Sequence, residues 1–286
     1  MFDKNNKLGD RMSSRDVPAF KNSLEWTTNT PEGGLMVRQL PNVLKCFCWQ
    51  HPLPEAPPYV HRHSGGDPVN SVLISGVGRS ASTVTWQILD LLTSGRVLKS
   101  HSFMDCCPTM FKFKKIIITI RHPFDHVFSV KKTHRHDGHG RKEFLNVALK
   151  EWQDVAKFLL LKNLQNSIGY RPDMEIAFLK YEDFWNKDLE RINFLSNFIG
   201  VELNSQQAEK ILSETSIEKN FERSQKAILA EKMGCELVLD NKIGPRHVDN
   251  TKGKIGLGKE LDQFTKQDIL DSCEWAFDEF GYSKDF

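Results

Sequence analysis

The sequence predicts an α/β protein of three layers, in which helices cover both faces of a central, mostly parallel sheet. Short apolar runs at 71–75, 116–120 and 175–179 are typical of buried strands. Helical patterns, with apolar residues at three- and four-residue steps, follow these runs. Strands that alternate with helices in this way indicate a parallel sheet with both faces covered.

Composition divides the chain of 286 residues into an arm and one main domain. Residues 1–70 are polar and then rich in proline, which indicates a partly irregular N-terminal arm with a hairpin around residues 34–49. Residues 71–286 are expected to form the main domain, since no internal repeat or interdomain linker interrupts them.

The main domain opens with residues 71–92, SVLISGVGRSASTVTWQILDLL, which read as a strand, a loop with two glycines and a helix. After the strand at 116–120, Pro123 is placed for the first turn of a helix. A long helix is predicted over 142–165 from apolar residues with the spacing of a core face: Phe144, Leu145, Ala148, Trp152, Val155, Phe158 and Leu159. Further helices are predicted near 188–199, 205–214 and 266–280.

Bulk composition argues against several classes of protein. A net charge of +2 does not suggest a nucleic-acid partner. No apolar run approaches the ~20 residues of a membrane span, and the N-terminus lacks the apolar core of a signal peptide, so we expect a cytoplasmic protein without a membrane partner. The six cysteines form no C-x-x-C pair, and the histidines of the HRHDGH segment (His134, His136, His139) are interpreted as part of a solvated basic loop. No metal site is therefore expected.

The loop over residues 76–83 is suited to holding an anion. It joins a strand to a helix, so backbone N–H groups and the helix N-terminus point at one place. When Gly76 is aligned with the first glycine of the P-loop pattern G-x-x-x-x-G-K-[ST], the last three positions become Ala81, Ser82 and Thr83. The lysine that reaches the β- and γ-phosphates is missing, and Arg79 stands earlier in the loop. We therefore predict a phosphate cradle that is poorly suited to ATP.

Four further segments carry side chains suited to anion binding and proton transfer. In the segment K-S-H, Lys99 and His101 share one face of a predicted strand, because side chains alternate with period two. Arg121 stands at a strand end and Ser129 two turns into the next helix, an arrangement that fits a phosphate. The other two segments are a strand end with an aromatic hydroxyl, Tyr181, and a late basic loop with glycines over residues 245–256.

Together these segments resemble the motifs of the cytosolic-type sulfotransferases. The motifs G-x-x-R-S-x-S-T, K-x-H, R-x-P-x-D-x-x-x-S, Y-E-D and R…K-G-x-x-G occur in the order of that family over residues 71–265. The resemblance implies a P-loop-like fold with a phosphosulfate-binding loop, and transfer of a sulfuryl group from 3′-phosphoadenosine 5′-phosphosulfate (PAPS). It also implies a small-molecule acceptor with a hydroxyl or an amine, and chemistry without a metal because side chains supply the cations.

The resemblance assigns the donor-binding residues to three tasks. The loop would hold the 5′-phosphosulfate through Arg79, Ser80, Ala81, Ser82 and Thr83. Arg121 and Ser129 would hold the 3′-phosphate. Either Arg246, or Lys252 with Gly253, would close over that phosphate. The adenine would contact Tyr181 and Thr215, whereas Trp86 could contact it or could pack its helix against the sheet.

The same resemblance gives the catalytic roles. His101 would act as the general base toward the acceptor, and Lys99 and Arg79 would stabilise charge on the transferring group and the leaving phosphate. An acceptor pocket could be lined by the N-terminal arm and by apolar residues that fit equally well in an ordinary core: Phe103, Met104, Cys106, Phe111 and Phe113.

The sequence departs from the family pattern in its loop, and other functions stay open. Ala81 replaces the usual loop glycine, so the backbone there is expected to avoid a positive φ.

A P-loop kinase of small molecules would share the fold but would need a Walker lysine and a carboxylate for Mg²⁺. A nucleotide-binding module without catalysis is the other alternative, and the presence of both Lys99 and His101 argues against it.

Overall fold

A five-stranded sheet forms the centre of the protein. The computed structural model describes residues 61–62, 72–100, 113–134, 141–169, 172–233, 243, 248 and 251–285. The strands are β1 (His61–Arg62), β2 (Val72–Gly76), β3 (Val97–Lys99), β4 (Lys115–Ile120) and β5 (Glu175–Lys180), in the spatial order β1-β3-β2-β4-β5. Strands β3, β2, β4 and β5 pair in parallel, and β1 pairs antiparallel with β3 at the edge. The predicted mostly parallel sheet is confirmed.

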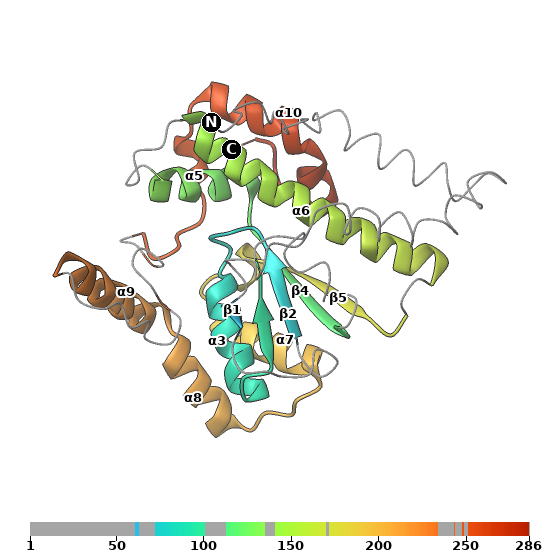
Figure 1. Ribbon diagram of the computed structural model, residues 1–286, viewed down its shortest axis with the longest axis vertical. Helices are drawn as coiled ribbons and strands as arrows, with labels where there is room; N and C mark the ends of the chain where they lie inside the picture. Colours follow the sequence, from blue (N-terminus) through green and yellow to red (C-terminus); the bar gives the residue numbers. More distant parts are fainter. Residues whose placement is uncertain are drawn as a thin grey trace, which may run out of the picture.

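Helices cover both faces of the sheet, as Figure 1 shows. Helices α5 (Pro123–His134), α6 (Arg141–Ile168) and α10 (Gln263–Phe280) lie on one side, and α3 (Ser82–Thr93), α7 (Asp188–Ile199) and α8 (Ser205–Thr215) lie on the other. Helix α9 (Ile217–Lys232) follows α8, and short 3₁₀ turns η3 (Glu182–Phe184) and η4 (Leu257–Glu260) complete the described elements. The three-layer α/β/α architecture is therefore confirmed.

Two apolar cores hold the layers together, because successive side chains of each strand point to opposite faces. On the α5, α6 and α10 side, Leu73 and Ile116 pack with helix residues such as Trp152. On the α3, α7 and α8 side, Ile74 and Ile117 pack instead. Phe113, which could have lined an acceptor pocket, is fully buried in the first core.

The predicted helices lie close to the observed ones, with Pro123 at the start of α5. Helix α9 was not predicted. Its buried residues are Asn220, Arg223, Ser224 and Ala227, so an apolar pattern could not reveal it. Apart from β1, the N-terminal arm with its hairpin lies outside the described residues, and the division into arm and domain stays a prediction.

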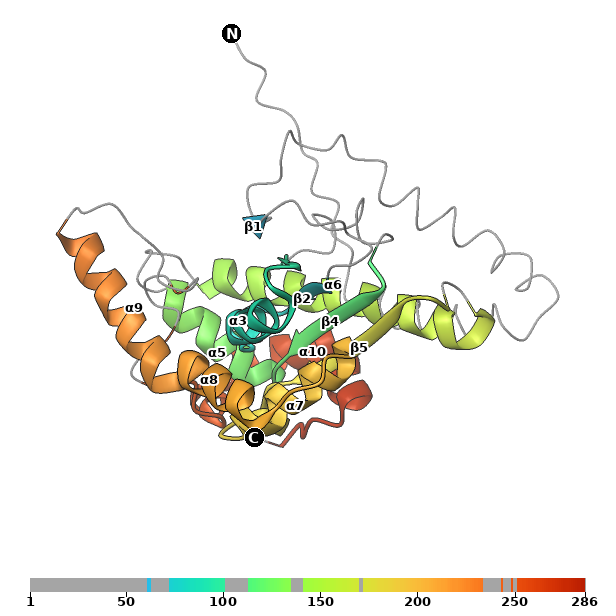
Figure 2. The ribbon, with the colours of Figure 1, turned by 90° about the horizontal axis from the view of Figure 1, so that it is seen from below.

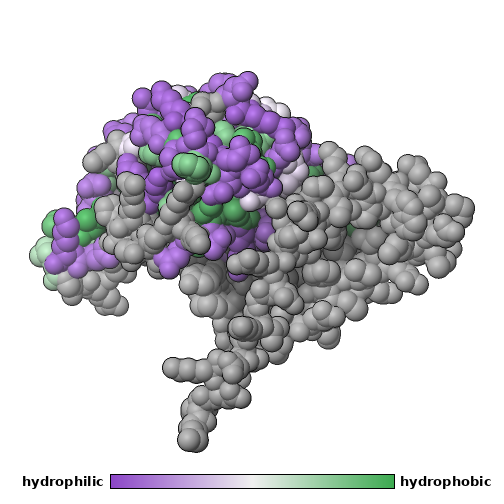
Figure 3. All heavy atoms as spheres, turned by 90° about the horizontal axis from the view of Figure 1, so that it is seen from above, coloured by the Kyte–Doolittle hydropathy of each residue, from purple (hydrophilic) through white to green (hydrophobic). Residues whose placement is uncertain are grey.

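Figure 2 shows the ribbon from below, with α9 extending outward beyond α8 on one side. In Figure 3, the described residues of the visible face are mainly hydrophilic, with scattered apolar side chains. None of the helices in the described part of the chain is long and apolar enough to cross a membrane.

Candidate active site

The loop between β2 and α3 folds back tightly against β4. Gly76 has a φ of 119°, and a Cβ atom there would lie 2.1 Å from the Thr119 carbonyl oxygen, so only glycine fits this first loop position. The next residue, Val77, donates its N–H to the same carbonyl at 3.0 Å. These contacts fix the point at which the chain leaves the strand and turns toward the helix.

Two loop residues adopt the left-handed conformation without being glycine. Arg79 has a φ of 60° and Ala81 a φ of 61°. The expectation that Ala81 avoids positive φ is therefore wrong. Left-handed residues between right-handed ones turn successive N–H groups toward one concave face, which is the geometry of an anion-binding nest. We interpret the strain, about 1–2 kcal/mol for a non-glycine residue, as the cost of forming this concavity.

The hydroxyl residues of the loop separate into two groups. Ser80 is buried, and its hydroxyl donates to the Val77 carbonyl at 2.5 Å and lies 2.7 Å from Thr119 Oγ1. It does not line the cavity described below, whereas Ser82 and Thr83 do. Ser80 thus supports the loop from beneath, and the two hydroxyls at the start of α3 face the cavity.

Lys99 ends strand β3 beside the start of α3. It is buried, lines the cavity and donates from Nζ to Thr83 Oγ1 at 2.8 Å. Its Nζ also lies 5.6 Å from the centre of the Trp86 ring. Trp86 itself is buried in the core on the α3 side and does not line the cavity, which agrees with the packing role. His101, the predicted general base, lies outside the described residues.

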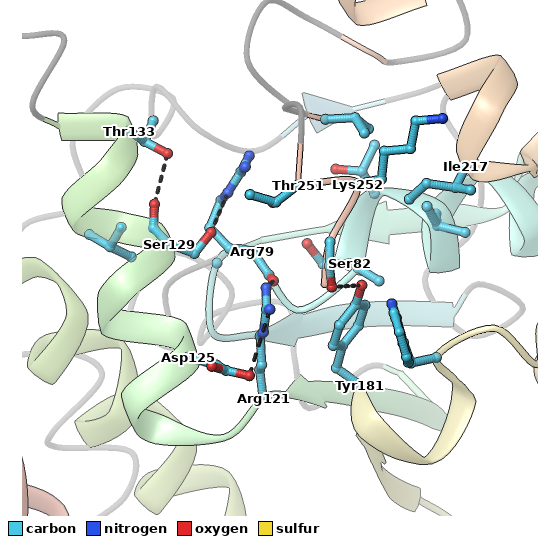
Figure 4. Close-up of a pocket in the computed structure, with 18 of the residues that line it drawn as sticks. Arg79, Ser82, Arg121, Asp125, Ser129, Thr133, Tyr181, Ile217, Thr251 and Lys252 are labelled. Carbon is cyan, nitrogen blue, oxygen red and sulfur yellow. Dashed lines mark hydrogen bonds and ion pairs between the residues drawn. The ribbon is translucent and has the colours of Figure 1, made fainter. Parts of the chain in front are cut away.

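From the carboxyl end of β4, Arg121 connects the loop over residues 76–83 to the late basic loop. Its Nη1 donates to the Arg79 carbonyl at 3.2 Å and its Nη2 to the Lys254 carbonyl at 2.8 Å. The guanidinium stacks on the Tyr181 ring at 4.6 Å, and its buried Nε has no hydrogen-bond partner. On the next helix, Ser129 Oγ accepts a bond of 3.1 Å from Arg79 Nε. The structure therefore brings the predicted 3′-phosphate residues Arg121 and Ser129 next to the predicted phosphosulfate residue Arg79 (Figure 4).

The residues predicted to contact the adenine also line the cavity, and Tyr181 lies directly beside Arg121. Tyr181 is buried and donates its hydroxyl to the Gly253 carbonyl at 2.6 Å. Burial raises the pKa of Tyr181, so the phenol stays neutral at physiological pH. Thr215 donates to the Ile211 carbonyl at 2.8 Å and also faces the cavity. Lys252 and Gly253 line the cavity too, while Arg246 lies outside the described residues.

These walls enclose a cavity of about 330 Å³, which is within the size range of small-molecule sites. Among the described residues, six basic and three acidic side chains line it: Arg79, Lys99, Arg121, Lys132, Arg191 and Lys252, with Asp125, Glu151 and Asp188. This excess of basic over acidic side chains favours an anionic occupant.

Sequence reasoning missed two acidic residues of this cavity. Glu151 on α6 accepts the Gly78 N–H at 2.8 Å, and its carboxylate lies 2.8 Å from His126 Nε2. Asp125 accepts two backbone N–H groups, from Gly256 at the end of the late basic loop and from Gly258 in η4. Asp125 stood inside a recognised motif without a role, whereas the position of Glu151 in a long apolar helix gave no signal.

The fold and the cavity define a class: an α/β protein whose loop after β2 resembles a P-loop but lacks the Walker lysine, with the buried Arg121 guanidinium beside it. The sulfotransferase-domain model matches residues 23–242, well over half of the chain. The chain therefore belongs to the sulfotransferase family, and the predicted enzyme class is confirmed. A search of curated proteins found no match.

Solved structures agree at the level of the fold. Retinol dehydratase in a complex with retinol and PAP aligns at a TM-score of 0.51 with 14% identity, over 74% of this chain and 82% of that chain. Retinol dehydratase with androsterone and the inactive cofactor PAP gives 0.50 and 14%, over 73% and 81%. The mouse sulfotransferase SULT7A1 complexed with PAP gives 0.49 and 14%, over 75% and 90%. At this level of identity, the two retinol dehydratase comparisons show a shared fold.

Proposed function

We propose that this protein transfers the sulfuryl group of PAPS to the hydroxyl or amine of a small molecule. One observation carries the choice of donor: the buried guanidinium of Arg121 is part of the cavity wall, next to but distinct from the loop over residues 76–83. A buried cation is stabilised by an anionic partner, and a phosphate in the cavity would supply one. Two adjacent cationic positions fit a nucleotide with a 5′-phosphosulfate and a separate 3′-phosphate.

The residues of the cavity fit the parts of this donor. The loop N–H groups, Ser82 and Thr83 would hold the phosphosulfate, and Arg121 with Ser129 would hold the 3′-phosphate. Lys252 and Gly253 would close that phosphate site from above. The PAP complexes of the sulfotransferase-fold neighbours support a donor of this type.

In the transfer step, a new bond forms between the acceptor atom and sulfur, while the bond from sulfur to the bridging phosphate oxygen breaks. We propose that His101 takes the proton of the acceptor, which contributes ~10²–10⁴-fold in rate. Lys99 and Arg79 would stabilise the negative charge that accumulates on the leaving oxygen. Lys99 is positioned for this task by its bond to Thr83 at the N-terminus of α3.

The acceptor is proposed to be a small alcohol, phenol or amine in the cytoplasm. The retinol dehydratase complexes contain retinol and androsterone, which are small alcohols. The likeness in fold between retinol dehydratase and this chain supports a small-molecule acceptor. Its identity is open to a screen with PAPS once donor binding has been established.

The test is titration calorimetry of the full chain with 3′,5′-adenosine bisphosphate (3′,5′-ADP), AMP and Mg·ATP. We expect 3′,5′-ADP to bind at least ~10-fold more tightly than AMP, because a charged hydrogen-bonding contact to the second phosphate is worth about 1.5–3 kcal/mol. A preference for Mg·ATP would contradict the proposed donor. In transfer assays, His101→Ala should lower kcat while leaving 3′,5′-ADP binding intact, whereas an unchanged rate would remove His101 from the mechanism.

A further inference from the structure

Asp125 is a buried carboxylate that holds the late basic segment, residues 251–258, against the base of the cavity. It lies in the first turn of α5 and is 1% exposed. One oxygen accepts the Gly256 N–H at 2.7 Å and the other accepts the Gly258 N–H at 2.6 Å. Hydrogen bonds to an ionised carboxylate are stronger than neutral ones, so this contact joins two parts of the chain far apart in sequence.

The fit between the basic segment and α5 is close. A Cβ atom at Gly258 would lie 2.5 Å from the backbone carbonyl carbon of Phe124, so the segment can rest on the first turn of α5 only with glycine there. The turn η4 follows directly at Leu257 and starts from Gly256. The position of the segment therefore depends on Gly256 and Gly258 and on the carboxylate that receives their N–H groups.

The same segment forms one wall of the cavity. Thr251, Lys252, Gly253 and Leu257 line it, and Arg121 donates to the Lys254 carbonyl at 2.8 Å. Asp125 Oδ2 also lies 3.8 Å from Arg121 Nη2. One carboxylate thus acts on both the buried guanidinium and the segment that faces it (Figure 4).

A carboxylate in an anion-binding cavity would ordinarily repel an anionic ligand. Here both oxygens of Asp125 receive backbone N–H groups of the segment, and its charge faces Arg121. These contacts engage the carboxylate with protein partners and hold the segment beside Arg121, which donates to the Lys254 carbonyl. The location of Asp125 is therefore explained by its role in holding the segment in place, and not by direct contact with an anionic ligand.

We propose that Asp125 is a positioning residue that sets the preference of this site for nucleotides with a second phosphate. The inference rests on the proposed function, because it takes the Arg121 and Gly253 side of the cavity as the 3′-phosphate site. It adds a determinant of specificity that does not itself touch the nucleotide.

The experiment compares Asp125→Asn with wild type by calorimetry with 3′,5′-ADP and with AMP. Asparagine offers one acceptor oxygen and turns an NH₂ group toward the second glycine N–H, so the segment should lose its fixed position. We expect the dissociation constant for 3′,5′-ADP to rise about 10- to 100-fold, as for loss of a charged hydrogen bond, and that for AMP to change less than about threefold. In steady state, the KM for PAPS should rise with little change in kcat.

Two controls separate positioning from a general loss of structure. Asp262→Asn removes another carboxylate that accepts a backbone N–H, from Thr265 at 2.9 Å, and it should leave both nucleotide affinities unchanged. Trypsin should cleave the basic segment of Asp125→Asn after Lys252 or Lys254 faster than that of wild type. Gly258→Ala disturbs the same contact from the other side and should reproduce the selective loss, so it replaces Asp125→Asn if that variant does not fold.

The outcomes separate this inference from the proposed function. If wild type binds AMP as tightly as 3′,5′-ADP, the proposed function fails and there is no preference for Asp125 to set. If wild type discriminates and both variants discriminate equally well, only the role of Asp125 is overturned. An equal loss of affinity for both nucleotides would also overturn it, because a collapsed cavity does not select between them.

Discussion

At the scale of single residues, the site depends on Arg121, whose side chain is 5% exposed and which donates to two loops. Lysine would keep the positive charge but could not span both carbonyls and still offer an N–H to an anion. We expect Arg121→Lys to weaken 3′,5′-ADP binding about 10- to 100-fold in calorimetry. Arg223→Lys is the matched control, because Arg223 is a buried arginine that pairs with Glu214 on α8. Equal effects of the two variants would contradict the assignment of Arg121.

The left-handed conformation of Ala81 gives a prediction on stability. Its φ of 61° is strained for alanine, and glycine would relieve that strain while adding freedom to the unfolded chain. We expect Ala81→Gly to raise the free energy of unfolding by up to about 1 kcal/mol in urea titrations. Ala156→Gly, inside helix α6, should lower it by about 1 kcal/mol. The backbone conformation would be contradicted if both variants lost stability alike.

At the scale of elements, the sequence predicted what apolar pattern and turn chemistry encode. The buried runs of β2 and β4 and the apolar face of α6 were clear, and so was the start of α5 at Pro123. Helix α9 was missed because its buried face is polar, with Asn220 and Ser224 fully buried. The motifs located Arg79, Arg121 and Tyr181, but Asp125 and Glu151 act through backbone partners that only the tertiary fold brings near.

That polar face connects α9 to the helix that follows the anion-binding loop. Gln87 and Asn220 exchange two amide hydrogen bonds of 3.0 and 2.9 Å, and Asn220 also donates to the Thr215 carbonyl at 3.1 Å. We expect Gln87→Leu and Asn220→Leu each to lower the free energy of unfolding by about 1–3 kcal/mol, because each removes both hydrogen bonds between the two buried amides.

The double variant should lose less than the sum of the single losses, by a coupling of about 0.5–3 kcal/mol in denaturant titrations. Gln87→Leu combined with Thr265→Val, on α10 at the other face of the sheet, should be additive. Additivity of the Gln87 and Asn220 changes would mean that the two amides do not act as a pair.

At the scale of the whole molecule, the C-terminal tail is held against the sheet by titratable groups. His122 Nε2 lies 3.1 Å from the Ser283 carbonyl oxygen, and the ring lies 5.0 Å from that of Tyr282. Glu182 accepts the His122 backbone N–H at 2.8 Å and the Tyr282 hydroxyl at 3.1 Å. Burial lowers the pKa of His122 and raises the pKa of Glu182, since it disfavours the charged form of each.

These two shifts predict opposite contributions to stability in acid. Below about pH 6.5 the unfolded chain protonates His122 more readily than the folded protein does, so this group lowers the free energy of unfolding as the pH falls. Glu182 takes up its proton in the folded protein at a higher pH than in the unfolded chain, so it raises the free energy of unfolding as the pH falls. Urea titrations between pH 7 and pH 4 should therefore show a smaller loss for His122→Gln than for wild type, and a larger loss for Glu182→Gln. Parallel pH profiles for the three proteins would show that the tail is not held by a neutral His122, and the contact with Ser283 would then need another explanation.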